Sequence, residues 1–267
     1  PVPDTQRETM ADAPLSTPTS PDTFVAGDVT MKIDPGTGAR IVSFALEGSN
    51  NVLTGPDVNS LNYGSTFWPS PQSAWGWPPP TAIDSEEYET FLEPGRVRAE
   101  GKVDKELGIS VSKIFEVRSS ERAIDVTYRM NNQGTKAVSL ASWEISRVPT
   151  GGLTFFPTGE VGEIVMEGDG VKPRLHLENE GGVTWFAWRK EEITDHMKSF
   201  ADGAEGWLAH VEGDLLLVKV FAPIASSQRA PEEAEIELYA NLERTYVEVE
   251  QQGPYTKIEP GKSVDWK

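Results

Sequence analysis

The chain has 267 residues, of which 37% are hydrophobic, so it is long enough to bury a sizeable core. It carries 24 Lys and Arg against 42 Asp and Glu, and its formal net charge of -18 repels nucleic acid, anionic membrane surfaces and polyanionic glycans. It contains no cysteine, which excludes disulfides, thiolate zinc sites and cysteine nucleophiles, and it has no apolar run of the length that predicts a membrane span.

The first 22 residues are rich in Pro, Thr, Ser and Asp and poor in apolar side chains. This composition cannot offset its ordering entropy, so we predict a disordered or extended tether over residues 1–22 and a single domain over residues 23–267. We interpret the tether as a stalk left when a bacterial export or lipid-anchor signal is removed, which implies a periplasmic or extracellular location. An ordinary disordered terminus is the alternative.

From residue 23 onward, short segments rich in β-branched and aromatic residues alternate with turn sequences. Helical periodicity is weak, and only residues 191–200 predict a turn or two of helix. The pattern predicts an all-β chain folded as one large antiparallel β-sandwich. The predicted strands are residues 24–33, 40–46, 95–103, 108–117, 123–131, 136–148, 152–158, 163–166, 172–178, 182–188, 206–212, 214–221, 233–242, 246–252 and 263–266.

Residues 64–80 hold three of the eight tryptophans together with five prolines and two glycines. Proline fixes φ and lacks a backbone donor, so we predict a stiff loop that is neither helix nor central strand. The indoles of Trp68, Trp75 and Trp77 suit the apolar face of a sugar ring, whose hydroxyls would bond to rim groups such as Gln72. The alternative is that these tryptophans cover the core as an irregular lid.

Residues 246–252 alternate and predict a strand with Tyr246, Glu248, Glu250 and Gln252 on one face and the two valines on the core face. If the polar face is concave and partly dry, repulsion between the two carboxylates raises the proton affinity of one of them. The alternative is a solvated outer face.

The segment Val249-Glu-Gln-Gln252 resembles the Leu-Glu-Thr-Gln element of the aldose 1-epimerases, the galactose mutarotase-like proteins. Residues 34–44 resemble the opening hairpin of that family, and residues 64–71 resemble its Gly-Gly-x-x-x-Phe-Pro segment. The tryptophan-rich run and the closing Glu-x-Gln-Gly-Pro-Tyr resemble an uncharacterised bacterial branch of the superfamily, DUF4380. The resemblance implies a galactose mutarotase-like β-sandwich with Glu250 as a general base.

Two departures from the family bear on the reaction. Mutarotation needs a base at the anomeric hydroxyl and an acid at the ring oxygen. The family's acid is a histidine in a Thr-Asn-His-x-Tyr strand, but residues 140–146 put Trp143 at that position, and an indole N–H cannot supply a proton. The family's substrate-binding arginine after Phe-Pro is also missing, so Trp143 and Trp75 become stacking positions.

The histidines are weak replacements for that acid. His176 alternates with Arg174 and Glu178 on the polar face of a predicted strand, from which it can reach the same cleft; an exposed surface histidine is the alternative. Asp195 and His196 are adjacent and point apart on an extended chain, so we predict no hydrolytic triad.

We therefore predict a carbohydrate-binding protein whose partner is a neutral mono- or oligosaccharide, with no cofactor and no metal. A sugar isomerase that uses Glu250 as its base and a non-catalytic sugar-binding module both stay open, and a protein-interaction domain is a third reading. The predicted catalytic residue is Glu250. The predicted substrate-binding residues are Trp68, Gln72, Trp75, Trp77, Trp143, His176 and Gln252.

Overall fold

The computed structural model describes residues 18, 20–166 and 173–267. The predicted tether therefore lies almost wholly outside the described residues, and both the tether and the implied location stay predictions. No helix among the described residues is long and apolar enough to cross a membrane.

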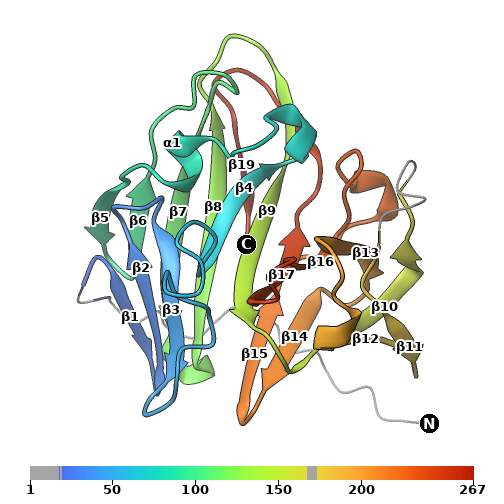
Figure 1. The fold of residues 1–267 in the computed structure, drawn as a ribbon. Coiled ribbons are helices and arrows are strands. Elements are labelled where there is room, and N and C mark those ends of the chain that lie inside the picture. The colour runs from blue at the N-terminus through green and yellow to red at the C-terminus, as the bar shows by residue number, and fades with distance from the viewer. Residues whose placement is uncertain (1–17, 19, 167–172) are drawn as a thin grey trace, which may run out of the picture.

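Antiparallel strands dominate the described part of the chain, which confirms the predicted all-β sandwich (Figure 1). In that part, fourteen strands form one large sheet and five form a second. The large sheet follows the order β1 (Thr23–Ala26), β2 (Val29–Asp34), β3 (Arg40–Leu46), β4 (Ser65–Ser70), β9 (Val138–Pro149), β17 (Tyr246–Gln252), β16 (Ile236–Ala240), β13 (Met197–Gly203), β10 (Leu153–Ile164), β12 (Val183–Ala187) and β11 (Glu178–Glu180).

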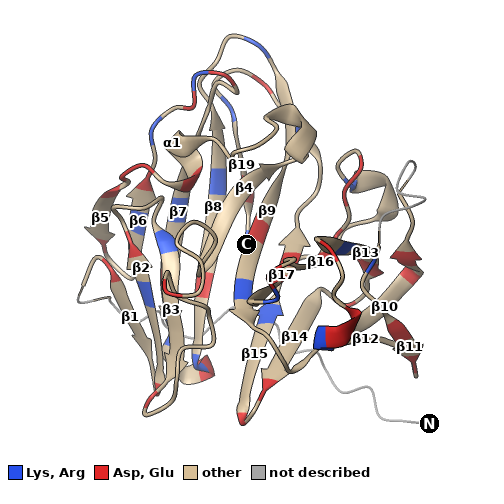
Figure 2. Cartoon of the chain, in the orientation of Figure 1, with Lys and Arg blue, Asp and Glu red and all other residues tan. Residues whose placement is uncertain are grey.

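Three further strands extend this sheet, because β14 (Trp207–Glu212) pairs with β10 and β15 (Leu215–Val220), and β18 (Thr256–Ile258) pairs with β9. The second sheet has the order β19 (Ser263–Trp266), β8 (Ala123–Asn132), β7 (Ile109–Arg118), β6 (Arg96–Glu100) and β5 (Glu89–Glu93). Figure 2 shows basic positions along β6, β7 and β8 and acidic positions on β10 and β11. The short helical turns are η1 (Gln72–Ala74), α1 (Thr81–Asp84), η2 (Ser119–Glu121), η3 (Lys190–Glu192) and η4 (Ser226–Gln228).

Apolar side chains that alternate along the strands join the two sheets. Phe67 of β4 stacks on Tyr128 of β8 with ring centroids 4.6 Å apart, and Tyr128 stacks in turn on Trp266. Val247 and Val249 of β17 lie fully buried in the same core. The predicted core face of residues 246–252 is therefore confirmed, and burial of this face turns the alternate residues toward the other side of the sheet.

The prediction that residues 64–80 contain no central strand is wrong, because β4 pairs along its length with β9. Its pairing with β3 is confined to Ile41 and Ser65, so one edge of β4 is open where Pro69 lies. The Pro69 carbonyl accepts a hydrogen bond from Trp75 Nε1 (2.7 Å), which places the backbone polar side of Pro69 at that open edge. The nitrogen of Pro69 carries no hydrogen, but because it lies at this open edge no hydrogen bond between β4 and β9 is lost.

Several other element boundaries differ from the predictions. Residues 24–33 form a hairpin, because Gly27 takes a positive φ of 66° between β1 and β2. Residues 152–158 and 163–166 belong mainly to the single bulged strand β10, and residues 173–177 lie outside the strands. Residues 191–200 do not form the predicted helix, because Met197 to Gly203 pair as β13 with both β16 and β10.

Candidate functional site

The polar face of β17 forms one continuous surface with its neighbours in the large sheet. Directly opposed residues in an antiparallel pair share a face, and Glu250 pairs with Glu237 of β16 and with Ile145 of β9. The next positions bring Gln252 beside Trp143 and Tyr239 beside Glu248. Register therefore gathers residues from three separate parts of the sequence on this face.

Glu250 is fully buried in this surface. Its Oε2 accepts hydrogen bonds from Trp143 Nε1 at 2.8 Å and Lys198 Nζ at 3.2 Å, while its Oε1 has no partner among the described residues. Burial raises the pKa of Glu250 to about 6, and the Lys198 cation opposes the rise. Most Glu250 carboxylates are thus ionised at pH 7, with one oxygen free to accept a proton or a hydroxyl hydrogen bond.

Glu237 faces Glu250 and shares the same cation. Lys198 Nζ lies 2.5 Å from Glu237 Oε2, and Glu237 Oε1 accepts hydrogen bonds of 2.8 Å from the Gln252 amide and from the Ala234 backbone N–H. Burial raises the pKa of Glu237 to about 8 against the effect of Lys198. Burial alone would lower the pKa of Lys198, but the two carboxylates raise it well above its usual value, so the ammonium stays charged.

Lys198 also closes the approach to these carboxylates. Its Nζ lies 4.6 Å from the centroid of Trp143, and its side chain is 26% exposed whereas those of Glu237 and Glu250 are 0% exposed. A ligand therefore meets Lys198 first. Contact with Glu250 requires the flexible lysine side chain to move aside.

The four predicted stacking tryptophans form one cluster with Trp68 at its centre. Edge-to-face contacts join Trp68 to Trp75, Trp77 and Trp143, with centroids 5.8, 6.0 and 5.5 Å apart. Trp68 and Trp143 are buried, Trp75 is half-buried and Trp77 is 60% exposed. Only Trp75 and Trp77 therefore present ring surface to a ligand, while Trp143 orients Glu250 through its indole N–H.

The tryptophan-rich segment is tied to the C-terminal half of the chain. The backbone N–H of Gln72 donates to Glu233 Oε1 at 2.9 Å, and Glu233 lies in the loop before β16. Trp68 Nε1 donates to Asp84 Oδ1 at 2.7 Å, which holds the ring from the other side. These bonds bring the early tryptophans and the late glutamates into one cluster.

Three groups on this face were not predicted from the sequence. Lys198 and Glu237 complete the charge cluster, and Tyr239 Oη lies 2.6 Å from Nδ1 of His196, whose ring is nearly parallel to that of Tyr239. The alternation of Glu235, Glu237 and Tyr239 with apolar residues is a strand signal that could have placed them on a shared face. The register that sets them opposite Glu248 and Glu250 is not visible in the sequence.

Arg147 reaches the same face from β9. Its guanidinium carbon lies 5.3 Å from the Trp68 centroid, and its Nε donates to Glu248 Oε1 at 2.8 Å. The side chain is fully buried, so it supports the Trp68 ring rather than presenting a charge to ligand.

His176 does not join the cluster. It lies on the segment before β11, it is 64% exposed, and its Nε2 is 3.8 Å from Glu178 Oε1. The neighbouring Leu175 carbonyl accepts a hydrogen bond from Ser199, whose side chain lies on the opposite face of β13 from Lys198. The structure therefore places His176 apart from Glu250, and its predicted part in sugar binding stays a prediction.

No group of three or more His, Asp or Glu in the described ranges is arranged to hold a metal ion. The roles of Trp68, Gln72, Trp75, Trp77, Trp143, Glu250 and Gln252 in ligand binding also stay predictions.

The fold is that of the galactose mutarotase-like proteins. A galactose mutarotase-like protein from Lactobacillus casei superposes with a TM-score of 0.62 at 11% identity, covering 91% of this chain and 97% of that one. A galactose mutarotase related enzyme from Lactobacillus acidophilus gives a TM-score of 0.55 at 8% identity, covering 91% and 94%.

A longer protein also contains this fold. A TPR-domain containing protein from Parabacteroides distasonis gives a TM-score of 0.59 at 16% identity, and the match covers 89% of this chain but only 44% of that protein. At these identities the likeness shows the fold alone. No curated protein sequence matches the chain with significance.

Sequence similarity to one family is more direct. Residues 71–267 match the family described as "Domain of unknown function (DUF4380)", which is the branch that the tryptophan-rich run and the closing Gln-Gly-Pro-Tyr resemble. The match takes in Glu237, Glu250, Lys198 and the half-exposed Trp75. Because it spans well over half of the sequence, the chain belongs to the DUF4380 family.

Proposed function

We propose that the chain binds a neutral sugar or a short neutral oligosaccharide on the face formed by β9, β17, β16 and β13. The observation that carries the proposal is a continuous series of contacts from two partly exposed indoles to a carboxylate with an unpartnered oxygen. Trp75 and Trp77 contact Trp68, and Trp68 contacts Trp143. The indole N–H of Trp143 donates a hydrogen bond to Glu250. Sugars present apolar C–H faces and polar edges, which suit such a pairing.

In the proposed complex, the sugar ring lies against Trp75 and Trp77, and its hydroxyls face Lys198 and the side chain of Gln72. Lys198 donates, and Glu250 Oε1 accepts once Lys198 has moved aside. With Lys198 counted against Glu233, Glu237 and Glu250, the local charge is not positive, so a neutral ligand is favoured over an anionic one.

A fluorescence titration with a panel of neutral mono- and oligosaccharides tests the proposal. We expect saturable quenching for at least one sugar, and we expect Trp75→Ala to weaken its binding about tenfold or more, since stacked aromatic anchors contribute about 1–3 kcal/mol each. Trp207→Phe is the control, because Trp207 contacts Phe155 on another part of the large sheet. Absence of quenching across the panel would contradict sugar binding.

A second candidate function, interconversion of sugar anomers, is favoured by the Tyr239 and His196 pair on the same face. Glu250 would take the anomeric proton, and the hydroxyl of Tyr239, supported by the imidazole, would donate to the ring oxygen. Saturation-transfer NMR on freshly dissolved aldoses measures this exchange directly. We expect the anomers to exchange faster with the protein than in buffer, and we expect this acceleration to be lost in Tyr239→Phe and in Glu250→Gln. Exchange at the buffer rate for every aldose would contradict the isomerase function and leave sugar binding as the proposed function.

A further inference from the structure

Strand β15 lies at an open edge of the large sheet, because among the described residues it pairs only with β14. The Phe221 backbone N–H donates to the Gly206 carbonyl at 2.8 Å, which extends the β14–β15 register by one bonded pair. Bonded and non-bonded pairs alternate along an antiparallel ladder, so every second residue back from Phe221 also bonds to β14. The backbone N–H and C=O groups of the residues in between therefore point to the open edge, and these residues are Leu216, Val218 and Val220.

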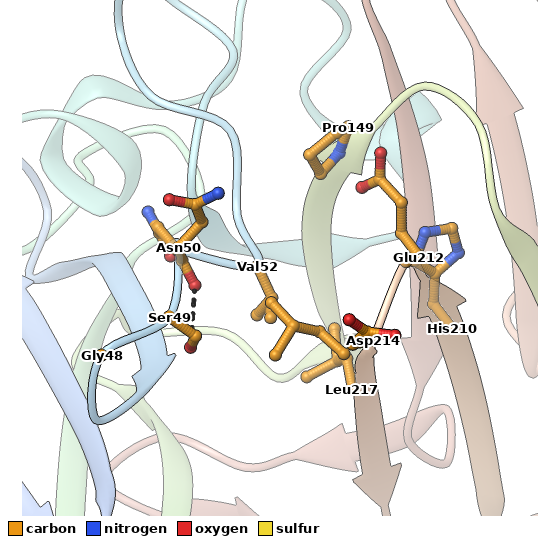
Figure 3. Close-up of a pocket in the computed structure, with 12 residues that line it drawn as sticks. Gly48, Ser49, Asn50, Val52, Pro149, His210, Glu212, Asp214 and Leu217 are labelled. Atoms are coloured by element: carbon orange, nitrogen blue, oxygen red, sulfur yellow. Dashed lines mark hydrogen bonds between the residues drawn. The ribbon is translucent and has the colours of Figure 1, made fainter.

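The same three residues form an exposed apolar row. Leu216, Val218 and Val220 are 56%, 48% and 73% exposed, and no described residue makes a hydrogen bond to their backbone groups. The alternate side chains of β15 face the core, and Figure 3 shows Leu217 beside Val52 on that side. The row thus combines unpaired backbone groups with apolar side chains.

The one charged residue of β15 does not protect this edge. Lys219 is turned to the core side, where its Nζ donates to the Val249 carbonyl at 2.9 Å and forms an ion pair with Glu144. Its side chain is only 10% exposed. A lysine that reaches into solvent from an edge strand opposes the addition of another strand, but a lysine held in the core does not.

The other edge strands in the described part of the chain are protected by shortness or by charge, which are two common ways to block strand addition. β1 has four residues, whereas β15 has six. The strands β5, β11, β18 and β19 carry exposed charged residues, namely Glu89, Glu178, Glu180, Lys257 and Asp265. Among the described edge strands, β15 therefore stands apart as both long and without exposed charge.

We propose that two copies of the chain associate through β15, which pairs antiparallel with β15 of the second copy about a two-fold axis at Val218. An open strand edge is filled by a strand that has a free edge of its own, and β15 meets this condition. In this register Val218 lies opposite the partner's Val218, and Leu216 lies opposite the partner's Val220. Each of these pairs can exchange two backbone hydrogen bonds, so all the edge groups of the row find partners.

Charge and symmetry favour a second copy as the occupant. The net charge of -18 opposes association wherever acidic residues would face each other. Residues 215–221 contain no acidic residue, and Asp214 lies opposite the partner's Ala222 in this register. A two-fold pair also uses the same edge on both copies, so the assembly closes as a dimer. The interface is small, which suits a dimer that dissociates on dilution.

Sedimentation velocity and amide hydrogen exchange on the intact chain test the dimer. Over a wide range of concentration, we expect the average mass to rise from that of a monomer toward that of a dimer. The amides of Leu216, Val218 and Val220 should become protected from exchange over the same range. The amides of Leu217 and Lys219, which bond to β14, should be protected at every concentration and serve as the internal control.

A charge at the axis gives the sharpest variant. Val218→Lys places two like charges opposite each other and should weaken the dimer at least tenfold. Val25→Lys is the matched control, because Val25 is 55% exposed on the edge strand β1 and its replacement should leave association unchanged. The exchange pattern of the wild type depends on no variant, so it decides the question if Val218→Lys does not fold.

Three results would overturn the proposal. The first is a chain that stays monomeric at every concentration, with rapid exchange at the three edge amides. The second is loss of association in Val25→Lys but not in Val218→Lys, which would move the interface to β1. The third is protection of the three amides that does not change with concentration, which would show that another part of the chain covers this edge. None of these results depends on sugar binding, because the row lies outside the tryptophan and glutamate cluster.

Discussion

Two glutamate and lysine pairs lie on opposite faces of the same two strands. On the core face, Glu144 of β9 pairs with Lys219 of β15, and on the other face Glu250 of β17 pairs with Lys198 of β13. Both glutamates are buried and both lysines approach from a strand outside the β9–β17 pair. The two glutamates differ mainly in how completely their carboxylate oxygens are paired.

Both carboxylate oxygens of Glu144 are paired, although the side-chain oxygen of the neighbouring Gln251 has no partner among the described residues. Glu144 Oε1 accepts from the hydroxyls of Ser65 and Ser146, and Oε2 accepts from the Gln251 amide and from Lys219. Lys219 Nζ also donates to the Val249 carbonyl at 2.9 Å, which anchors the β14–β15 hairpin to the large sheet.

Glu250 differs, because its Oε1 has no partner among the described residues. Buried polar groups are usually paired, and a group left without a partner requires an explanation such as a ligand. The pairing of Glu144 fits a role in the stability of the fold, and the unpartnered Oε1 of Glu250 supports the proposal that its face binds a ligand.

The largest expected effect is on the ion pair of Glu144 and Lys219. Lys219→Met leaves Glu144 buried without its cation, and we expect the free energy of unfolding to fall by about 3–5 kcal/mol. Urea denaturation of the wild type and the variant at pH 7 measures this change. The double variant Glu144→Gln/Lys219→Met should recover much of the lost free energy of unfolding, because no unpaired charge is then buried. A loss below about 1 kcal/mol in Lys219→Met would contradict a role of this pair in the stability of the fold.

A smaller effect is expected on the Glu250 side. Lys198→Met should cost about 2–3 kcal/mol at pH 8, because Glu237 and Glu250 then lack their shared cation. The cost should shrink at pH 5, since burial already raises the pKa values of Glu237 and Glu250 to about 8 and about 6, so both carboxyls can take up a proton. Urea unfolding at the two pH values gives the result, and an equal cost at both would contradict the shared-cation arrangement.

The smallest effect concerns the pH dependence of Glu250→Gln. The pKa of Glu250 is raised from 4.5 to about 6 in the folded chain, so its contribution to stability is fully present below pH 4.5 and is lost as pH rises through about 6. Glu250→Gln has no carboxyl at this position, so its stability does not fall in this pH range. Between pH 4 and pH 7 its stability should therefore improve relative to wild type by about 1–2 kcal/mol, and parallel stability curves in urea would show that burial does not perturb this carboxyl.

Strand alternation made much of the fold predictable. Residues 40–46, 246–252 and 263–266 were predicted with the bounds that β3, β17 and β19 have, because each alternates or runs apolar between clear turn residues. Pro69 concealed β4, since a sequence does not show that the proline lies at an open edge of an interior strand.

The site was less predictable than the fold. The motif around Glu250 and the tryptophan-rich run could be read directly, but Lys198 lies in a segment that was predicted as helix, and Glu237 and Tyr239 carry no motif. His176 was placed near the cleft by its alternation alone, and the structure puts it elsewhere because Leu175 packs on the other face of β13.

The amino-acid sequence by itself determined the all-β character of the chain, the faces of its strands and the chemistry available on residues 68–77 and 246–252, because side-chain alternation and proline content are local properties. Only the tertiary structure decided that Glu237 faces Glu250 across a shared lysine and that Trp143 bonds to Glu250. Those contacts depend on strand register between distant segments, which is set by how the whole core packs.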